Sequence, residues 1–421
     1  GNYPVGTGNV ALGDTALDDG SLSGGYNTAI GNEALTANTS GSVNVAVGQG
    51  TLYLNTTGQS NVAVGGNAMA DNTTGNYNTA IGRYALADNT TASNNTAVGY
   101  QAGLANTTGT RIVGIGQGAL KANTTGGDNV AVGANSMLVS TTGNNNTSIG
   151  SASLYSQTTG TNNTALGNSA LFSNTIASNN TAVGYQSLYA NTTGALNTAM
   201  GKTSLYSNTT GAQNTGVGYE TLFANSTGSN NTAFGQQALT SNTTASNNTA
   251  VGYQAGLSNT TGAQNVFVGT QAGSTNTTAF NNVAVGFKPF FGSAAVTGGS
   301  NAVVGNYALY VNTTGLNNTG IGQQVLFGNT TGSYNVAVGS NALQANTTAS
   351  ENTAVGYKAL YANTTGDGNT AIGVKAMDAN TVGDRNVAVG ADALGTMNPS
   401  SNTDMYNTAV GYQAGLAVTT G

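Results

Sequence analysis

The sequence predicts an all-β protein, a parallel β-solenoid (β-roll) of about 24 stacked coils, each about 17 residues long. The first observation is a pentapeptide that returns at a constant interval, as at residues 27–31, 44–48 and 61–65. The second is glycine at the fifth place of every copy, from Gly13 to Gly411. The third is composition: only 5% of residues are charged, whereas 38% are hydrophobic and recur in phase, so we expect order rather than disorder.

Counted from its Asn, each coil follows the consensus N-[T/V]-A-[V/I]-G-x-x-A-L-x-A-N-T-T-G-x-N. Positions 1–5 alternate and are rich in β-branched residues, which predicts a short strand. Glycine at position 5 then marks a corner, and Asn-Thr-Thr-Gly at positions 12–15 predicts a turn. Since Gly, Asn and Thr recur within every possible helical turn, a helix is disfavoured. We expect the apolar residues at positions 4 and 9, such as Ile30 and Leu35, to face inward.

The repeated Asn and Gly residues are expected to form structural ladders along the stack. Stacked amide side chains can hydrogen-bond from one coil to the next, as in cross-β structures. The alternative for position 12, as at Asn55, is a glycan, because Asn-Thr-Thr is an N-glycosylation acceptor sequence. The ladder residues that begin the series are Asn27, Gly31, Asn44, Gly48, Asn61 and Gly65.

We expect residues 1–421 to form a single solenoid, with irregular coils at 1–26, 287–300 and 391–406. The interval between successive repeats widens at the last two of these, first from Asn282 to Asn301 and then from Asn386 to Asn407. Because the chain begins at Gly1 and ends inside a repeat, we expect a processed product or a segment of a longer protein.

Composition argues against most catalytic and ligand-binding classes. The chain has no Cys and no His, which removes thiolate and imidazole metal ligands and the usual catalytic triad. Its net charge of −6 comes from scattered residues without a basic stripe, so we expect neither nucleic-acid binding nor membrane insertion. Asp18 and Asp19 are the only adjacent carboxylates, so a glycan hydrolase is a weak third choice. We therefore expect no enzyme, no metal and no cofactor.

The unit N-[T/V]-A-[V/I]-G-x-x-A resembles the head repeat of YadA-like trimeric autotransporter adhesins. Its longer form, as at residues 352–366, is similar to repeats of phage tail fibres and bacterial tail-fibre-domain proteins. The resemblance covers essentially the whole chain and implies a left-handed β-roll, a homotrimer, and a location outside the cell, on a cell surface or on a virion. One departure is length, because coils of the adhesin heads are typically shorter.

Two features could form a binding surface. Phe287, Lys288, Phe290 and Phe291 lie in the first widened repeat, where an aromatic loop could stack on a sugar or protein partner. The alternative is that the coil bulges and the phenylalanines fold back as a plug. Tyr residues that recur at position 6 could form a rim that binds carbohydrate, or could simply cover a turn; they include Tyr100, Tyr185, Tyr219, Tyr253, Tyr357 and Tyr412. Residues 395–406 are expected to form a polar loop.

These observations predict a non-enzymatic structural fibre segment of an extracellular adhesin or phage tail fibre, an elongated shaft or head for surface attachment. Its expected partners are copies of itself, as a homotrimer or filament, and a cell-surface receptor or glycan. Small Ala residues on a flat face would let other chains pack closely. The alternatives are a self-assembling extracellular filament subunit and an ice- or carbohydrate-binding solenoid, and ice binding would need both Thr of each Thr-Thr pair to project from a flat strand.

Overall fold

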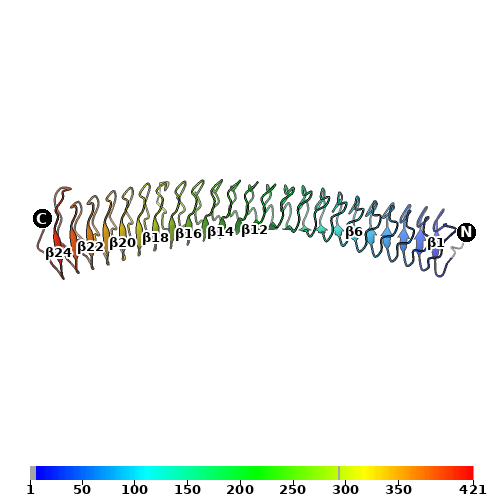
Figure 1. The fold of residues 1–421 in the computed structure, drawn as a ribbon, viewed down its shortest axis with the longest axis horizontal. Coiled ribbons are helices and arrows are strands. Elements are labelled where there is room, and N and C mark those ends of the chain that lie inside the picture. Colours follow the sequence, from blue (N-terminus) through cyan, green and yellow to red (C-terminus); the bar gives the residue numbers. More distant parts are fainter. Residues whose placement is uncertain (1–5, 293, 421) are drawn as a thin grey trace. The chain divides into compact units, whose positions relative to one another are not determined.

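The computed structural model describes residues 6–292 and 294–420, so expectations for residues 1–5, 293 and 421 lie outside the described part. The chain divides into two compact units, Gly1–Gln213 and Asn214–Gly421. Each unit contains twelve three-residue strands, one in each coil, and the described residues contain no helix (Figure 1).

The strands of the first unit are β1 (Val10–Leu12), β2 (Thr28–Ile30), β3 (Val45–Val47), β4 (Val62–Val64), β5 (Thr79–Ile81), β6 (Thr96–Val98), β7 (Val113–Ile115), β8 (Val130–Val132), β9 (Thr147–Ile149), β10 (Thr164–Leu166), β11 (Thr181–Val183) and β12 (Thr198–Met200). Those of the second unit are β13 (Thr215–Val217), β14 (Thr232–Phe234), β15 (Thr249–Val251), β16 (Val266–Val268), β17 (Val283–Val285), β18 (Ala302–Val304), β19 (Thr319–Ile321), β20 (Val336–Val338), β21 (Thr353–Val355), β22 (Thr370–Ile372), β23 (Val387–Val389) and β24 (Thr408–Val410).

Within each unit, every strand pairs in parallel with the strand of the next coil. The register joins identical positions of the repeat, so that Ala29 of β2 lies opposite Ala46 of β3. Backbone hydrogen bonds run in both directions along the stack: Thr28 N donates to Asn44 O over 2.8 Å, and Gly48 N donates to Ile30 O over 2.7 Å. The predicted parallel β-solenoid of about 24 coils at 17-residue spacing is confirmed.

The direction in which the strand side chains point differs from the prediction. Side chains alternate between the two faces of a strand, and position 3, not position 4, faces the interior. Ala29 is fully buried, whereas Ile30 is 37% exposed. The expectation that position 4 faces inward is therefore wrong, whereas Leu35 at position 9 is buried as expected. The Leu of each regular coil already fills the interior, which leaves the strand room for only a methyl group.

Changes of side-chain size inside the coil compensate one another, which supports this explanation. Position 9 is Gly rather than Leu at Gly256 and Gly273, and in the strand between them Phe267 replaces the usual Ala of position 3. The Phe267 ring is fully buried, and a Cβ atom added at Gly256 would lie 2.8 Å from its Cδ2. One aromatic ring thus occupies the space that two leucines fill elsewhere.

The corners of each coil depend on residues with positive φ. Glu33, Leu35 and Val43, at positions 7, 9 and 17, have φ of 58°, 54° and 61°, in the left-handed region that non-glycine residues enter only occasionally. Gly31 at position 5 has φ of 136°, and a Cβ atom there would lie 2.5 Å from the carbonyl oxygen of Gly48. Position 5 therefore requires glycine for its conformation and for the close approach of the next coil.

The widened repeats keep the strand ladder. In the first, Thr277 N donates to Val296 O, two residues later than the regular spacing would give, and the described residues Ala294 and Ala295 just before Val296 are exposed. In the second widened repeat, residues 400–404 are exposed, and Asn402 Nδ2 donates to Thr365 O over 3.3 Å. At the other end, β1 pairs with β2 across a coil that is slightly longer than the regular ones.

We expect Phe267→Ala to lower the free energy of unfolding by about 3–5 kcal/mol, because it leaves a cavity that neither flanking glycine can fill. The matched control is Phe234→Ala on β14, whose ring is 48% exposed on the outer face; its cost should be about 1 kcal/mol or less. Denaturant unfolding of both variants at one protein concentration measures the difference. Equal costs would contradict the assigned directions of positions 3 and 4.

Candidate functional site

Two columns of Asn side chains run through the interior of each unit. Asn44, at position 1, donates from Nδ2 to Gly58 O over 2.8 Å, and its Oδ1 accepts from the backbone N–H of Asn61 over 3.0 Å. Asn55, at position 12, donates from Nδ2 to Asn38 Oδ1 over 2.9 Å and to Gly58 O over 3.2 Å. In coils that have Asn at both positions, the backbone carbonyl of position 15 therefore accepts hydrogen bonds from both columns. The bonds to this carbonyl join residues within one coil, and the bonds to Asn Oδ1 join each coil to its neighbour.

The ladder residues predicted from the sequence lie in these columns and at the adjoining corners. Asn27, Asn44 and Asn61 are fully buried in the position 1 column, and Gly31, Gly48 and Gly65 all have positive φ. In the folded coil, position 12 gives a glycan no access, since its amide is buried and hydrogen-bonded.

The two Thr of each Thr-Thr pair have different roles. The hydroxyl of Thr56 donates to the carbonyl oxygen of Thr73 in the next coil over 3.0 Å, and Thr57 is exposed in the turn. The pair therefore does not present the double outward row on a flat strand that ice binding would require.

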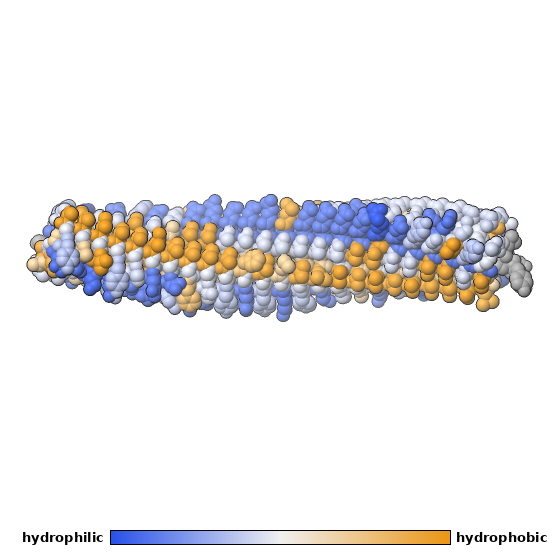
Figure 2. Space-filling view, turned by 90° about the horizontal axis from the view of Figure 1, so that it is seen from below, coloured by the Kyte–Doolittle hydropathy of each residue, from blue (hydrophilic) through white to orange (hydrophobic). Residues whose placement is uncertain are grey.

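Positions 2 and 4 form the outer face of the sheet in each unit. Position 4 is apolar in every described strand, and position 2 is Thr, Val or Ala, so no strand places a charge on this face. Ile30, Ile81 and Ile115 are 37–41% exposed. Rows of hydrophobic residues are visible in the view from below (Figure 2). The Ala residues of position 3 do not contribute to the flat face of small Ala residues that the sequence predicts, because they point inward.

The predicted binding residues of the first widened repeat divide between interior and surface. Phe290 takes position 9 and is 1% exposed, so it fills the place of Leu. Phe287 is exposed and meets the Tyr307 ring edge to face, with 5.4 Å between ring centroids. Lys288 Nζ lies 5.2 Å from the ring centroid of Phe287 and 4.4 Å from that of Phe291. Phe287, Lys288 and Phe291 thus form a surface cation–π cluster.

A row of aromatic rings at position 10 was not predicted as a unit. Tyr155, Phe172, Tyr189 and Tyr206 stack in four successive coils of the first unit, with centroids 5.0–5.2 Å apart and planes within 11° of parallel. The signal in the sequence is the run of aromatic residues at one position of the repeat. The position 6 tyrosines expected as a rim, such as Tyr100, are exposed.

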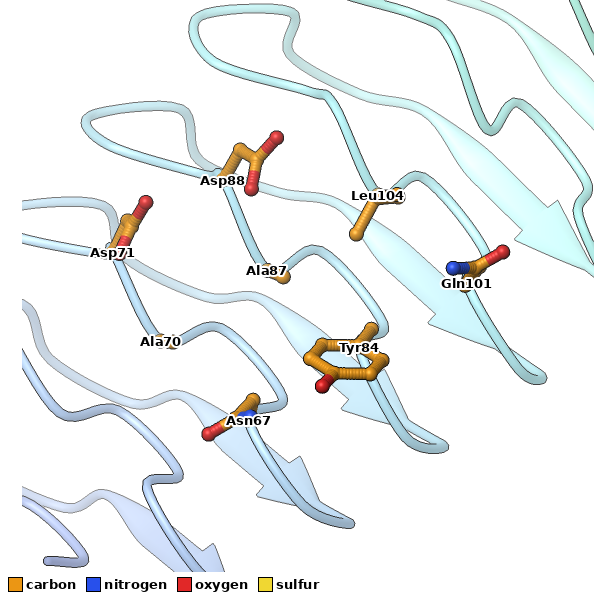
Figure 3. A pocket seen from close by; sticks show the side chains of 8 residues that line it. All are labelled: Asn67, Ala70, Asp71, Tyr84, Ala87, Asp88, Gln101 and Leu104. Atoms are coloured by element: carbon orange, nitrogen blue, oxygen red, sulfur yellow. The ribbon is translucent and has the colours of Figure 1, made fainter.

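A hollow of about 370 Å³ on the first unit was also missed. It arises because position 10 is Ala in two successive coils, at Ala70 and Ala87, where a neighbouring coil has Leu104. Asp71 and Asp88 stand on neighbouring coils along one side of it, with the Tyr84 ring on the other side (Figure 3). The remaining lining residues are Asn67 and Gln101.

The surroundings of Asp88 and Tyr84 at this hollow shift the pKa values of both side chains. Burial raises the pKa of Asp88, and the negative charge of Asp71 raises it further. The guanidinium of Arg83 donates a hydrogen bond to the Tyr84 hydroxyl, which lowers the pKa of Tyr84. In the same unit, a hydrogen bond from Arg111 lowers the pKa of Asp128.

The described residues offer neither a cluster of metal-ligand side chains nor a membrane-spanning helix. Within 6–292 and 294–420, no group of three or more His, Cys, Asp or Glu side chains is placed to hold a metal ion. The same ranges contain no helix with the length and apolar character needed to cross a membrane. In comparisons with known proteins, no protein-family model matches the chain and no curated protein matches it.

We expect Asp71→Asn to lower the pKa of Asp88 toward its ordinary value, because the charge of Asp71 is removed while burial remains. A carboxyl whose pKa is raised on folding binds its proton more tightly in the folded state. Folding stability therefore falls as the pH rises from the unfolded pKa of about 3.9 through the raised folded value. This dependence should be weaker in the variant.

The measurement is a titration of the Asp side-chain carboxyl carbons by NMR. Asp14→Asn, which lies outside the hollow, is the control and should leave the Asp88 titration unchanged. An unchanged Asp88 titration in Asp71→Asn would contradict the assigned coupling.

Proposed function

We propose that this chain is a non-enzymatic structural fibre segment of an extracellular adhesin or phage tail fibre, which acts as a shaft or head in surface attachment. This proposal rests on the regular coil interior, in which the same hydrogen bonds of the backbone and of the Asn side chains recur from coil to coil. In such a stack each coil contacts only its neighbours, so length grows with coil number at little cost to packing. The resemblance of the repeat to trimeric adhesin heads and tail fibres supports the same proposal.

The partner we propose first is a second and third copy of this chain, bound through the outer sheet face. Twelve strands about 4.8 Å apart and about 10 Å long give one unit a face of roughly 580 Å². Two such faces would bury roughly 1,150 Å², near the lower end of about 1,200–2,000 Å² for specific interfaces. The face carries no charge to repel a copy of itself, and its rows have the same spacing in every copy.

The surface that we propose for a receptor or glycan is the cluster of Phe287, Lys288 and Phe291. It combines exposed aromatic area with a cation, whereas most of the described surface is uncharged. Aromatic side chains supply large contact areas for sugars and proteins, and the ammonium group would favour an acidic ligand.

The experiment is the native mass in solution by light scattering, with the wild type expected near three times 41.5 kDa. Ile81→Glu combined with Ile115→Glu places carboxylates on the outer face and should convert the trimer to monomers. Thr74→Glu combined with Thr108→Glu adds the same charge to exposed turns and should leave the trimer intact. A monomeric wild type would overturn the proposed trimer, and micrometre-long polymers would favour the filament alternative.

A further inference from the structure

The position 12 column has one interruption that leaves polar atoms without partners. From Asn38 to Asn123 the column is continuous, and each Asn donates from Nδ2 to the Oδ1 of the preceding coil, ending with Asn123 to Asn106 over 2.8 Å. In the next coil position 12 is Ser140, whose side chain is too short to continue the column. Asn123 Oδ1 and Ser140 Oγ are both buried, and neither has a hydrogen-bond partner among the residues that the structure describes.

The coil after Ser140 also departs from the pattern. Its position 12 is Gln157, which donates from Nε2 to Gly160 O over 2.9 Å and accepts at Oε1 from Asn163 Nδ2 over 3.2 Å. An amide group has two hydrogens, and this bond to Gly160 uses one of them. The other corresponds to the hydrogen that reaches back to the preceding coil elsewhere in the column.

Where the column ends elsewhere, the Oδ1 atom of the last Asn accepts a hydrogen bond from another group of the protein. Where the first widened repeat interrupts it, Asn276 Oδ1 accepts from Asn282 Nδ2 over 3.2 Å. Where Met397 replaces Asn, Asn380 Oδ1 accepts from the backbone N–H of Gly383 over 3.0 Å. Buried polar atoms in folded proteins almost always have a protein or water partner, so the pair at Asn123 and Ser140 calls for one.

We propose that one buried water molecule bridges Asn123 Oδ1 and Ser140 Oγ in the interior of the first unit. The water donates to the amide oxygen and accepts from the Ser140 hydroxyl, and the second amide hydrogen of Gln157 supplies a third bond. Two to four polar partners are what buried waters ordinarily have. The water replaces the missing Asn side chain and continues the column across a coil that would otherwise break it.

The test compares the number of long-lived internal waters in the full chain by ¹⁷O magnetic relaxation dispersion. Ser140→Asn restores the repeat residue and should reduce the number by one per chain relative to the wild type. Ser151→Asn adds the same group at an exposed position 6, where several coils already have Asn, and should leave the number unchanged. An equal number in the wild type and Ser140→Asn would overturn the proposal.

A second variant tests the site without relying on how Ser140→Asn packs. If the water is present, Ser140→Ala removes one of its partners and should lower the melting temperature by about 2–4 °C. If no water is present, the same change removes an unpartnered buried hydroxyl and the melting temperature should rise. A higher melting temperature for Ser140→Ala would therefore also overturn the proposal.

Discussion

The rest of the structure depends on how the narrow interior satisfies its backbone carbonyl groups. Each coil contains only a three-residue strand, so most of its backbone lies in corners outside the sheet. The carbonyl of position 15 points inward, and it is capped by Asn amides of positions 1 and 12. An unpartnered buried carbonyl costs about 1–3 kcal/mol, and this need recurs in every coil. The Asn columns therefore stabilise each coil that contains them.

Because the interior positions are constrained in this way, we expect binding surfaces to form from the outer positions of the coil. The interior is filled by Leu, Ala and hydrogen-bonded Asn, and few positions there can change without compensation, as Phe267 between Gly256 and Gly273 illustrates. The outer positions vary freely, which allows an apolar sheet face, an aromatic row, an acidic hollow and a cation–π cluster on one framework.

Periodicity alone was enough to predict the fold class, the strand positions and the corner at position 5. It could not predict which face of a three-residue strand is buried, because Ala and Val are both apolar and the choice depends on the Leu across the coil. The hollow at Ala70 and Ala87 was missed because it consists of two ordinary small residues that matter only when stacked. Phe290 and Phe291 are adjacent in the sequence, and only the structure distinguishes the fully buried Phe290 ring from the half-buried Phe291 ring.

The central claim is that buried Asn amides hold the coils together, and one pair of substitutions tests it most directly. Asn72→Asp replaces an amide that donates to Asn55 Oδ1 and Gly75 O with a buried carboxylate that can donate to neither. Asn94→Asp makes the same change at an exposed corner one coil away. In thermal unfolding at neutral pH, the first variant should lose several kcal/mol of stability, and the second should change by about 0.5 kcal/mol or less. Equal stability of the two variants would contradict the claim.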